Sequence, residues 1–305
     1  MRAVASPVYL LRQGRTAEAY EGARSGFAAM KKQGSSWVAD AAMVSADIAR
    51  QLARYEEAIT LAHEGVELAQ ELGQIYLSTP CAAQLSRLHA EVRGDAEEAA
   101  RWRAVVLELI DRPFGDMFAA SIWGHLGWAE LRLGHPREAA ELFTRSASVS
   151  SASTHLERPW SLLGAAEADL LLDDPGTSRG LLSQARHFGE RNRTATVAVG
   201  VGRVSGLIEV AAGEHAAALE MLRPASEAAA SMSLRGELWR ILTTMGEAHR
   251  GLGQEAEAAE AVAAARRAIE SIAADIVDEG LRSEFRRTVA TSAGLELSDG
   301  RSTGT

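Results

Sequence analysis

The stretch Gly134-His-Pro-Arg-Glu-Ala139 carries a pattern that occurs six times in the chain: a small residue at a turn is followed, five positions later, by an alanine. The six segments are Gly14–Ala19, Ala53–Ala58, Gly94–Ala99, Gly134–Ala139, Gly213–Ala218 and Gly253–Ala258. Their alanines lie 39, 41, 40, 79 and 40 residues apart, which gives a period of about 40 residues with one degenerate unit in the middle. A fixed period between about 20 and 50 residues is typical of a repeat architecture.

The clearest unit runs from Ser121 to about Ser151 and predicts two helices. Apolar residues recur in its first half every three or four positions, as on one side of a helix: Ile122, Trp123, Leu126, Ala129, Leu131 and Leu133. Gly134 ends this helix, because glycine tolerates the left-handed conformation in which helices often stop. Pro136 suits the first turn of the next helix, where a missing N–H costs nothing. The connection is so short that the two helices must lie antiparallel.

Composition supports an all-α fold. The chain has 305 residues, of which 47% are hydrophobic and 24% charged, so it can bury a core. Val, Ile, Thr and aromatic residues are too scattered to predict strands. We therefore expect an α-solenoid of about seven antiparallel helix pairs, in which each pair contacts only the pairs before and after it.

A small residue recurs where the two helices of a unit should touch. Gly127 lies in the middle of a predicted helix, where glycine costs about 1 kcal/mol relative to alanine. Close approach of the partner helix would offset that cost, and Gly127→Leu should then destabilise the pair. The same position, seven residues before each turn, holds Ala46, Gly206 and Gly246, and Gly164 takes this role in the degenerate unit. In the third unit the count falls on Arg87, although Ser86 fits if the turn is one residue longer.

Glycine and proline residues at the predicted turns divide a repeat array, residues 1–290, into units. The predicted units are 1–34, 35–74, 75–112, 113–153, 154–192, 193–232 and 233–272, followed by a capping helix at 273–290 and a flexible tail at 291–305. In the degenerate unit, Asp173-Asp174-Pro175-Gly176 predicts a turn, with a second helix from near Ser178 through Phe188.

Charge and cysteine content exclude several classes of protein. The net charge of −9 disfavours a nucleic-acid partner, which would require clustered Lys and Arg. The one cysteine, Cys81, cannot form an internal disulfide and is expected to be a small core residue. No signal peptide and no run of membrane-spanning length is recognisable. We expect a cytoplasmic protein without a membrane partner.

No complete catalytic or metal-binding motif is present. His63-Glu64-Gly65-Val66-Glu67 begins like a zinc-protease helix, but Glu67 stands where the second histidine ligand belongs. His89-Ala-Glu91 has the spacing of a zinc deaminase motif without the later cysteine pair. Phosphate-binding and nucleophile-elbow motifs are missing as well. We expect no enzyme activity, no metal and no cofactor.

Two segments carry a family resemblance. Trp123-x-x-Leu126-Gly127, followed by Gly134 and Glu138-Ala139, resembles the tetratricopeptide repeat (TPR), and Trp160-x-x-Leu163-Gly164 repeats its opening. The resemblance covers roughly residues 5–270 and implies a right-handed superhelix, although the period is near 40 rather than 34. Long units of this type are similar to the helical-repeat region of bacterial signal-transduction ATPases, including the maltose-activator-like and LuxR-type large regulators.

The resemblance also implies a concave groove. Trp128 occupies a position that faces this groove in the family, so Trp128→Ala should leave folding intact and weaken binding. The corresponding positions, which complete the candidate binding site, are Asp47, Arg50, Arg132, Arg203, Glu247 and Arg250. Such a groove would suit a peptide with acidic and apolar features. The competing interpretation is a solvated helix face with scattered charges.

The leading hypothesis is a non-catalytic scaffold that binds a protein, a peptide or a small effector, as the sensor region of a bacterial transcriptional regulator or signalling protein. No ATPase or DNA-binding motif is present, so the chain is expected to be a fragment of such a regulator or a solitary repeat protein. The alternative is a stand-alone TPR adaptor that assembles a complex constitutively. A third possibility, an α-solenoid enzyme, requires a pocket in which titratable groups converge. The ligand and the oligomeric state stay open.

Overall fold

The computed structural model describes residues 2–151 and 154–294, and in this part of the chain every regular element is a helix. The prediction of an all-α fold is therefore confirmed for the described residues. The α-helices are α1 (Arg2–Arg12), α2 (Thr16–Gln33), α3 (Val38–Gln51), α4 (Tyr55–Glu71), α5 (Ile75–Leu88), α6 (Ala96–Leu109), α7 (Ala119–Arg132), α8 (Pro136–Ser148), α9 (Thr154–Leu171), α10 (Pro175–Asn192), α11 (Ala195–Ala211), α12 (His215–Ser231), α13 (Arg235–Gly251), α14 (Glu255–Ala274) and α15 (Glu279–Ala293). A π-helix, η1 (His89–Arg93), follows α5 directly.

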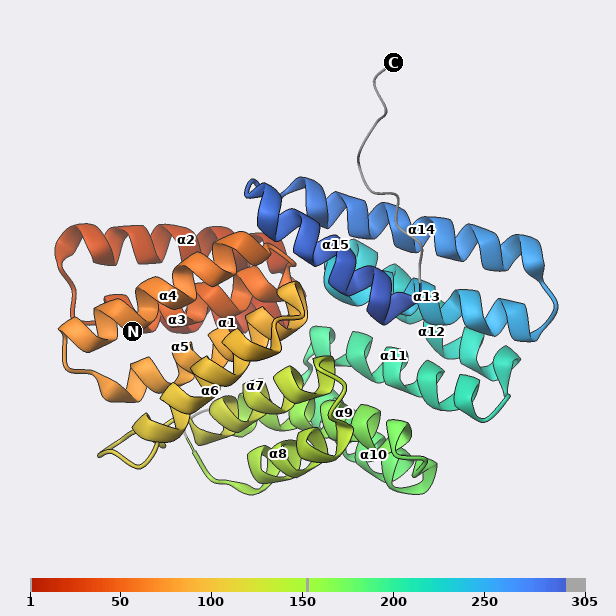
Figure 1. Cartoon of the computed structure of the whole chain (residues 1–305), viewed down its shortest axis with the longest axis horizontal. Helices are drawn as coiled ribbons and strands as arrows, with labels where there is room; N and C mark the ends of the chain where they lie inside the picture. Colours follow the sequence, from red (N-terminus) through yellow and green to blue (C-terminus); the bar gives the residue numbers. More distant parts are fainter. Residues whose placement is uncertain (1, 152–153, 295–305) are drawn as a thin grey trace, which may run out of the picture.

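Each helix packs against the next one in the chain (Figure 1). The odd-numbered helices from α1 to α13 also contact one another in succession, α1 with α3, α3 with α5, and so on to α13. They form an inner layer, and this layer positions the candidate site. No helix in the described part of the chain is long and apolar enough to cross a lipid bilayer.

The repeated small residue has a conformational cause. All six small residues that open the repeated segment have positive φ, from +55° at Ala53 to +83° at Gly134. Glycine adopts this left-handed conformation without the steric cost that other residues incur. The alanines five positions later lie between 0% and 3% exposed, because the second helix of each unit packs there against its neighbours.

The degenerate unit follows the same plan with other residues. Asp173 has a φ of +59° and takes the place of the turn glycine. Ser178 lies five positions later, is fully buried, and donates a hydrogen bond to the carbonyl oxygen of Ala166 at 2.7 Å. The predicted start of the second helix near Ser178 is wrong. The helix begins at Pro175, because the Asp174 side chain caps it by accepting from the Thr177 N–H at 3.0 Å.

The irregular third unit is explained by the π-helix η1. Its wider turn adds one residue before the turn at Gly94, which has a φ of +62°. Ser86 is consequently the residue that touches the partner helix, and its hydroxyl donates to the Ala99 carbonyl oxygen at 2.9 Å. Arg87 is rotated toward the inner layer, where it lines a cavity.

Phe143 of α8 fills the space that two glycines leave. A Cβ on Gly127 of α7 would lie 2.8 Å from the Phe143 ring, and one on Gly164 of α9 would lie 2.3 Å from it. At Gly206, an added Cβ would meet the side chain of Leu222 at 2.4 Å. Gly246 is less tight, with Val262 at 3.0 Å, and Ala46 is almost fully buried.

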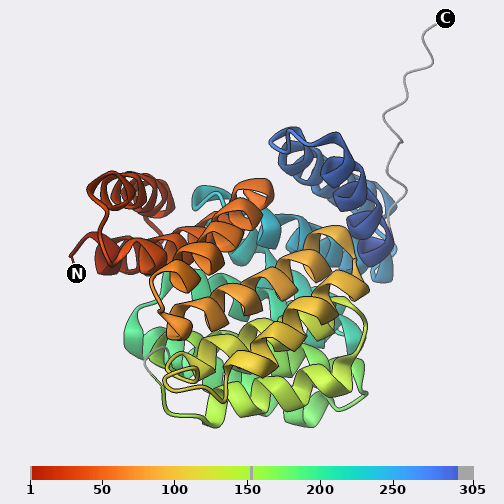
Figure 2. The ribbon, with the colours of Figure 1, turned by 60° about the vertical axis from the view of Figure 1, so that its left-hand side comes forward.

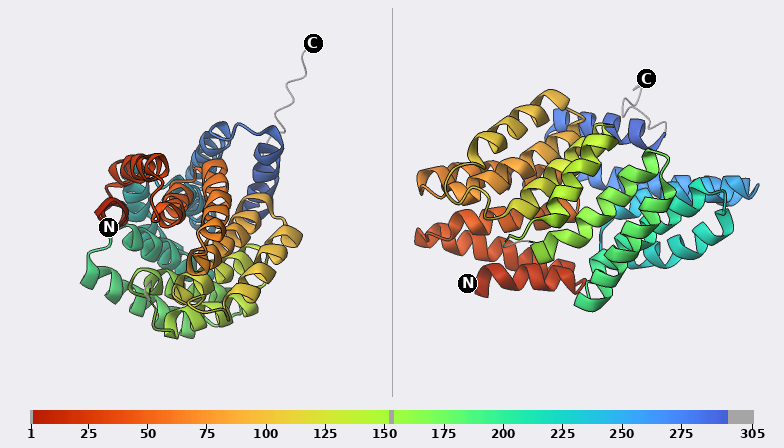
Figure 3. Two further views of the ribbon diagram at one scale, coloured as in Figure 1. Left: turned by 90° about the vertical axis from the view of Figure 1, so that its left-hand side faces the viewer. Right: turned by 90° about the horizontal axis from the view of Figure 1, so that it is seen from below.

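The two ends of the array meet, which corrects the expectation that each helix pair touches only its neighbours. Helix α1 contacts α11, and α15 contacts η1 (Figures 2 and 3). The Thr16 hydroxyl donates to the Met232 carbonyl oxygen at 2.6 Å, and Arg93 pairs with Glu284 at 2.8 Å. The Tyr55 and Phe285 rings pack with centroids 5.5 Å apart. An apolar core therefore joins the early helices to the last ones, a contact that a nearest-neighbour array does not make.

The capping helix extends further than expected. Asp278 caps α15 by accepting from the Leu281 N–H at 2.6 Å, and the helix continues to Ala293. Residues 291–293, expected in a flexible tail, are therefore helical, while 295–305 lie outside the described residues. Leu281 and Phe285, expected to cap the stack, are buried.

Two alanine substitutions in one unit test the close packing around Phe143. Gly164→Ala forces a Cβ into the Phe143 ring and should lower the free energy of unfolding by about 1–3 kcal/mol. Gly180→Ala is the matched control, because that glycine lies inside α10 with open space around it and should gain about 0.5–1 kcal/mol. Urea unfolding of both variants measures the difference. Equal stability of the two variants would show that the helices do not approach this closely.

Candidate functional site

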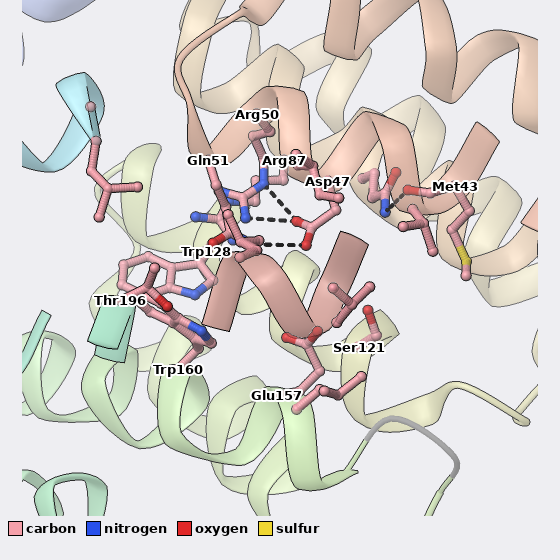
Figure 4. Close-up of a pocket in the computed structure, with 18 of the residues that line it drawn as sticks. Met43, Asp47, Arg50, Gln51, Arg87, Ser121, Trp128, Glu157, Trp160 and Thr196 are labelled. Atoms are coloured by element: carbon pink, nitrogen blue, oxygen red, sulfur yellow. Dashed lines mark hydrogen bonds and ion pairs between the residues drawn. The ribbon is translucent and has the colours of Figure 1, made fainter. Parts of the chain in front are cut away.

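A cavity of about 220 Å³ lies where the odd-numbered helices face one another (Figure 4). Its lining comes from all seven odd-numbered helices from α1 to α13, from Tyr55 at the start of α4, from η1 and from the adjoining turns. The lining includes apolar side chains, among them Met43 and Val44 of α3, Phe118 before α7, and Trp160 of α9. Charged side chains from α1, α3, α5, η1, α7, α9 and α13 line the same cavity.

Glu91 of η1 ties the third unit to the last one. One carboxylate oxygen accepts from Arg87 Nε at 3.2 Å, and the other accepts from Arg240 Nη2 of α13 at 2.9 Å. Burial alone would raise the Glu91 pKa, but the positive charges of Arg87 and Arg240 outweigh burial and lower it far below its usual value. Glu91 is thus a fixed anion between two arginines.

A second ion-pair chain runs behind the cavity. Glu167 of α9 accepts from Arg132 of α7 at 2.9 Å and from Arg203 of α11 at 2.7 Å. Arg203 also pairs with Glu237 of α13 at 2.8 Å. These pairs connect four successive odd-numbered helices, so the charges that lie inside the protein are largely compensated by one another.

Asp47 and Arg50 pair with each other on α3. The Arg50 Nη2 donates to Asp47 Oδ1 at 2.8 Å, while the Gln51 amide donates to Oδ2 at 2.8 Å. Both oxygens of Asp47 are therefore engaged. The charge of Arg50 still reaches Arg87, whose pKa falls to about 10 because of burial and, next, repulsion from Arg50.

Glu157 of α9 faces the cavity with an altered acidity (Figure 4). Burial is the main cause that raises its pKa to about 7, and the negative charge of Asp47 adds to the effect. Arg50, Arg87 and Arg12 act in the opposite direction without cancelling it. Near neutral pH, a large share of the Glu157 side chains is therefore a neutral acid that can donate a hydrogen bond.

Trp128 lies in the wall of the cavity and not on a solvated face. Its side chain is 4% exposed, and its ring packs edge-on against Phe143 with centroids 5.2 Å apart. The guanidinium carbons of Arg87 and Arg132 each lie 5.0 Å from the centre of its ring. The expectation that Trp128→Ala leaves folding intact is corrected, because the substitution would open a hole in a buried cluster.

The remaining predicted groove residues separate into three groups. Asp47, Arg50 and Arg132 line the cavity together with Trp128. Arg203 is 4% exposed and engaged in two ion pairs behind it. Glu247 and Arg250 lie on the exposed face of α13 and do not line the cavity, so the structure does not bring them together with the others.

Sequence reasoning missed Arg87, Glu91, Glu157, Trp160 and Arg240 as lining residues. A signal for Arg87 existed, because it follows Ser86 as Asp47 follows Ala46 and Trp128 follows Gly127. The one-residue shift caused by η1 concealed this correspondence. Trp160 and Arg240 each lie 13 residues before the turn residue of their unit, and Glu157 lies 16 residues before Asp173, as Glu237 does before Gly253. Their proximity across the array still depends on its closure.

The incomplete catalytic motifs do not assemble into a site. His63 packs edge-on against Trp102 with centroids 5.2 Å apart, which is a packing contact. Cys81 is fully buried against Gly65 and does not line the cavity. Within the described ranges, no three His, Cys, Asp or Glu side chains form a group that could hold a metal ion.

Comparison with known proteins gives little guidance. No family model matches the chain, and no curated protein matches it. A solved structure described as BtubC (BKLC) from P. vanneervenii shares 14% identity, with 100% of this chain and 96% of that chain covered and a TM-score of 0.42. A similarity at this level supports no inference about function.

The buried position of Trp128 predicts a large loss of stability on truncation. Trp128→Ala removes the contacts to Phe143 and to two guanidinium groups, and should lower the free energy of unfolding by about 3–5 kcal/mol. Trp37→Ala is the matched control, because the Trp37 side chain is 48% exposed and should change stability by only about 0.5 kcal/mol. Denaturant unfolding measures both. A Trp128→Ala protein as stable as the control would restore the solvated-face interpretation.

The raised pKa of Glu157 predicts how stability depends on pH. The pKa of Glu157 is about 7 in the folded protein, above the ordinary glutamate value of 4.5. The stability that proton binding by this carboxyl contributes is therefore fully present below about pH 4.5 and is lost as the pH rises through 7. Glu157→Gln cannot titrate, and this variant should gain stability relative to the parent protein between about pH 5 and about pH 8. Urea unfolding at both pH values measures the change. The exposed Glu141→Gln serves as control, and a Glu157→Gln difference that does not vary with pH contradicts the assignment.

Proposed function

We propose that this chain is a non-catalytic sensor region that binds a small effector in its central cavity. The observation that carries this proposal is the origin of the lining, because every odd-numbered helix from α1 to α13 contributes to it. A molecule bound there contacts early and late units at once. Binding would then stabilise the closed arrangement by mass action.

The size of the cavity favours a small molecule over a peptide. Pockets for drug-sized ligands measure about 300–1,000 Å³, whereas this cavity measures about 220 Å³. Its lining combines apolar and aromatic side chains with many charged and polar ones. Small-molecule sites combine apolar surface with convergent polar groups, although this lining is more highly charged than most such sites.

The repeat pattern also supports a proposal about the architecture of the chain. We propose a TPR-type, right-handed superhelix of seven antiparallel helix pairs whose early and late units meet. Positive φ at the repeated turn residues and small residues at the helix contacts support this view. The resemblance to bacterial transcriptional regulators suggests a cytoplasmic sensor that reports effector binding to other domains.

The alternatives to a sensor are an enzyme and a constitutive adaptor. The convergence of titratable groups in the cavity meets one requirement of an enzyme. The carboxylates of Asp47 and Glu91 are nevertheless engaged at both oxygens, which favours a binding role over proton transfer. The adaptor hypothesis requires no cavity at all and predicts partners that bind without a small molecule.

A thermal-shift screen against a metabolite library tests the sensor function. We expect at least one compound to raise the melting temperature in a saturable manner. Val44→Phe fills part of the cavity and should abolish this shift, whereas Val277→Phe, at a position 79% exposed, should retain it. A library without hits, together with the same protein partners recovered from lysate with and without small molecules, would favour the adaptor.

A further inference from the structure

The terminal nitrogens of Arg87, a residue of the cavity lining, take no part in the ion pairs described above. Arg87 donates through Nε to Glu91, and neither Nη atom donates a hydrogen bond to any residue in the described part of the chain. The side chain is 12% exposed and belongs to the cavity lining. A guanidinium has five N–H donors, so the four N–H groups on its terminal nitrogens have no hydrogen-bond acceptor in the described part of the chain.

The carboxylates around Arg87 are engaged elsewhere. Asp47 is held by Arg50 and Gln51, and Glu91 is shared between Arg87 and Arg240. Arg50 and Arg132 add positive charge near Arg87, and this charge helps to lower the Arg87 pKa. The lining therefore presents an arginine whose charge is incompletely compensated.

The apolar part of the lining fits an apolar group of limited size. Met43, Val44, Phe118 and Trp160 contribute to it, and the ring of Trp128 lies 5.0 Å from the Arg87 guanidinium carbon. A cavity of about 150 Å³ lined by apolar side chains is large enough for benzene. The present cavity, at about 220 Å³, has room for such a group and a short polar extension.

We propose that the cavity binds a small organic carboxylate with an aromatic or branched apolar body, whose carboxylate is held by the terminal nitrogens of Arg87. This inference rests on the proposed sensor function and names its ligand class. The planar guanidinium fork matches a carboxylate in a bidentate arrangement. The apolar body packs against Met43 and Trp160.

Glu157 makes binding depend on pH. The charged groups that face it are Arg12 of α1, Asp47 and Arg50 of α3, and Arg87 of α5. Protonated Glu157 adds no negative charge to the cavity, whereas ionised Glu157 repels an incoming carboxylate. Affinity for the anion should therefore fall as the pH rises through about 7, and Glu157→Gln should remove most of that fall.

Three probes of one shape test the ligand class: phenylacetate, the neutral 2-phenylacetamide and the cationic 2-phenylethylamine. Calorimetric titration of the full chain near pH 6 should detect phenylacetate binding. The amide and the amine should bind at least about tenfold more weakly, because charge-assisted bidentate hydrogen bonds are stronger than neutral ones.

Variants of Arg87 test the residue that holds the carboxylate. Arg87→Gln should weaken phenylacetate binding by roughly tenfold to a hundredfold. Arg87→Lys keeps a cation beside Glu91 and the fold with it, but loses the fork and should also bind at least about tenfold more weakly. Arg101→Gln, at a side chain 72% exposed, is the matched control and should bind like the parent protein. Melting curves of each variant verify folding.

The outcomes separate the two proposals. If the amide or the amine binds in the cavity as tightly as phenylacetate, the ligand class is wrong while the sensor function stands. Full phenylacetate affinity in folded Arg87→Lys and Arg87→Gln would overturn the role of Arg87. If none of the three probes binds, the carboxylate proposal fails, and the metabolite screen with Val44→Phe decides the sensor function independently.

Discussion

Closure of the array brings the charged inner faces of the odd-numbered helices together, and the other features of the interior depend on this constraint. Removing an ion from water costs several kcal/mol unless a partner of opposite charge compensates it. The structure compensates Glu91 with Arg87 and Arg240, and Glu167 with Arg132 and Arg203. The pair between Glu91 and Arg240 joins the third unit to the last pair of helices, so the same interaction neutralises charge and helps to hold the closed form.

The cavity is the place where this compensation is incomplete. Arg87 keeps its terminal nitrogens free of partners in the described part of the chain, and Glu157 has a pKa raised to about 7. A bound anion would compensate the charge of Arg87. Protonated Glu157 could donate a hydrogen bond to such an anion. Because the lining spans α1 to α13, ligand binding and closure would be linked in both directions. A change in closure is then a physical means of reporting occupancy to neighbouring domains, as the proposed function requires.

The local architecture could be predicted from the sequence because it depends on local chemistry. Positive φ at a turn favours glycine, and a tight helix contact favours a small residue. The roles of Gly134 and Gly127 can therefore be predicted from the sequence alone. The degenerate unit was recognised by its proline turn, although Asp173 and Ser178 replace the usual glycine and alanine. The π-helix η1 was visible only as a one-residue irregularity at Ser86.

The site depended on long-range contacts and could be predicted only in part. Four of the seven groove candidates line the cavity. Glu247 and Arg250 have the same offsets from their turn as Asp47 and Arg50 but do not line it, so the offset alone does not decide which residues face the cavity. Periodicity says nothing about where the array ends in space, so the meeting of α1 with α11 was not predicted. The burial of Trp128 follows from packing by Phe143, and the pairing of Arg203 follows from its contacts with the neighbouring helices α9 and α13. The spacing of the repeats predicts neither contact.

Small-angle X-ray scattering of the chain in solution tests the closed arrangement most directly, because open and closed arrays of the same helices differ in overall size. A compact chain of 305 residues has a radius of gyration of about 19 Å. We predict a value close to this, with only a small excess from the cavity and the terminal residues. A radius well above about 25 Å would mean an open superhelix whose ends do not meet, and the central cavity could not exist as described.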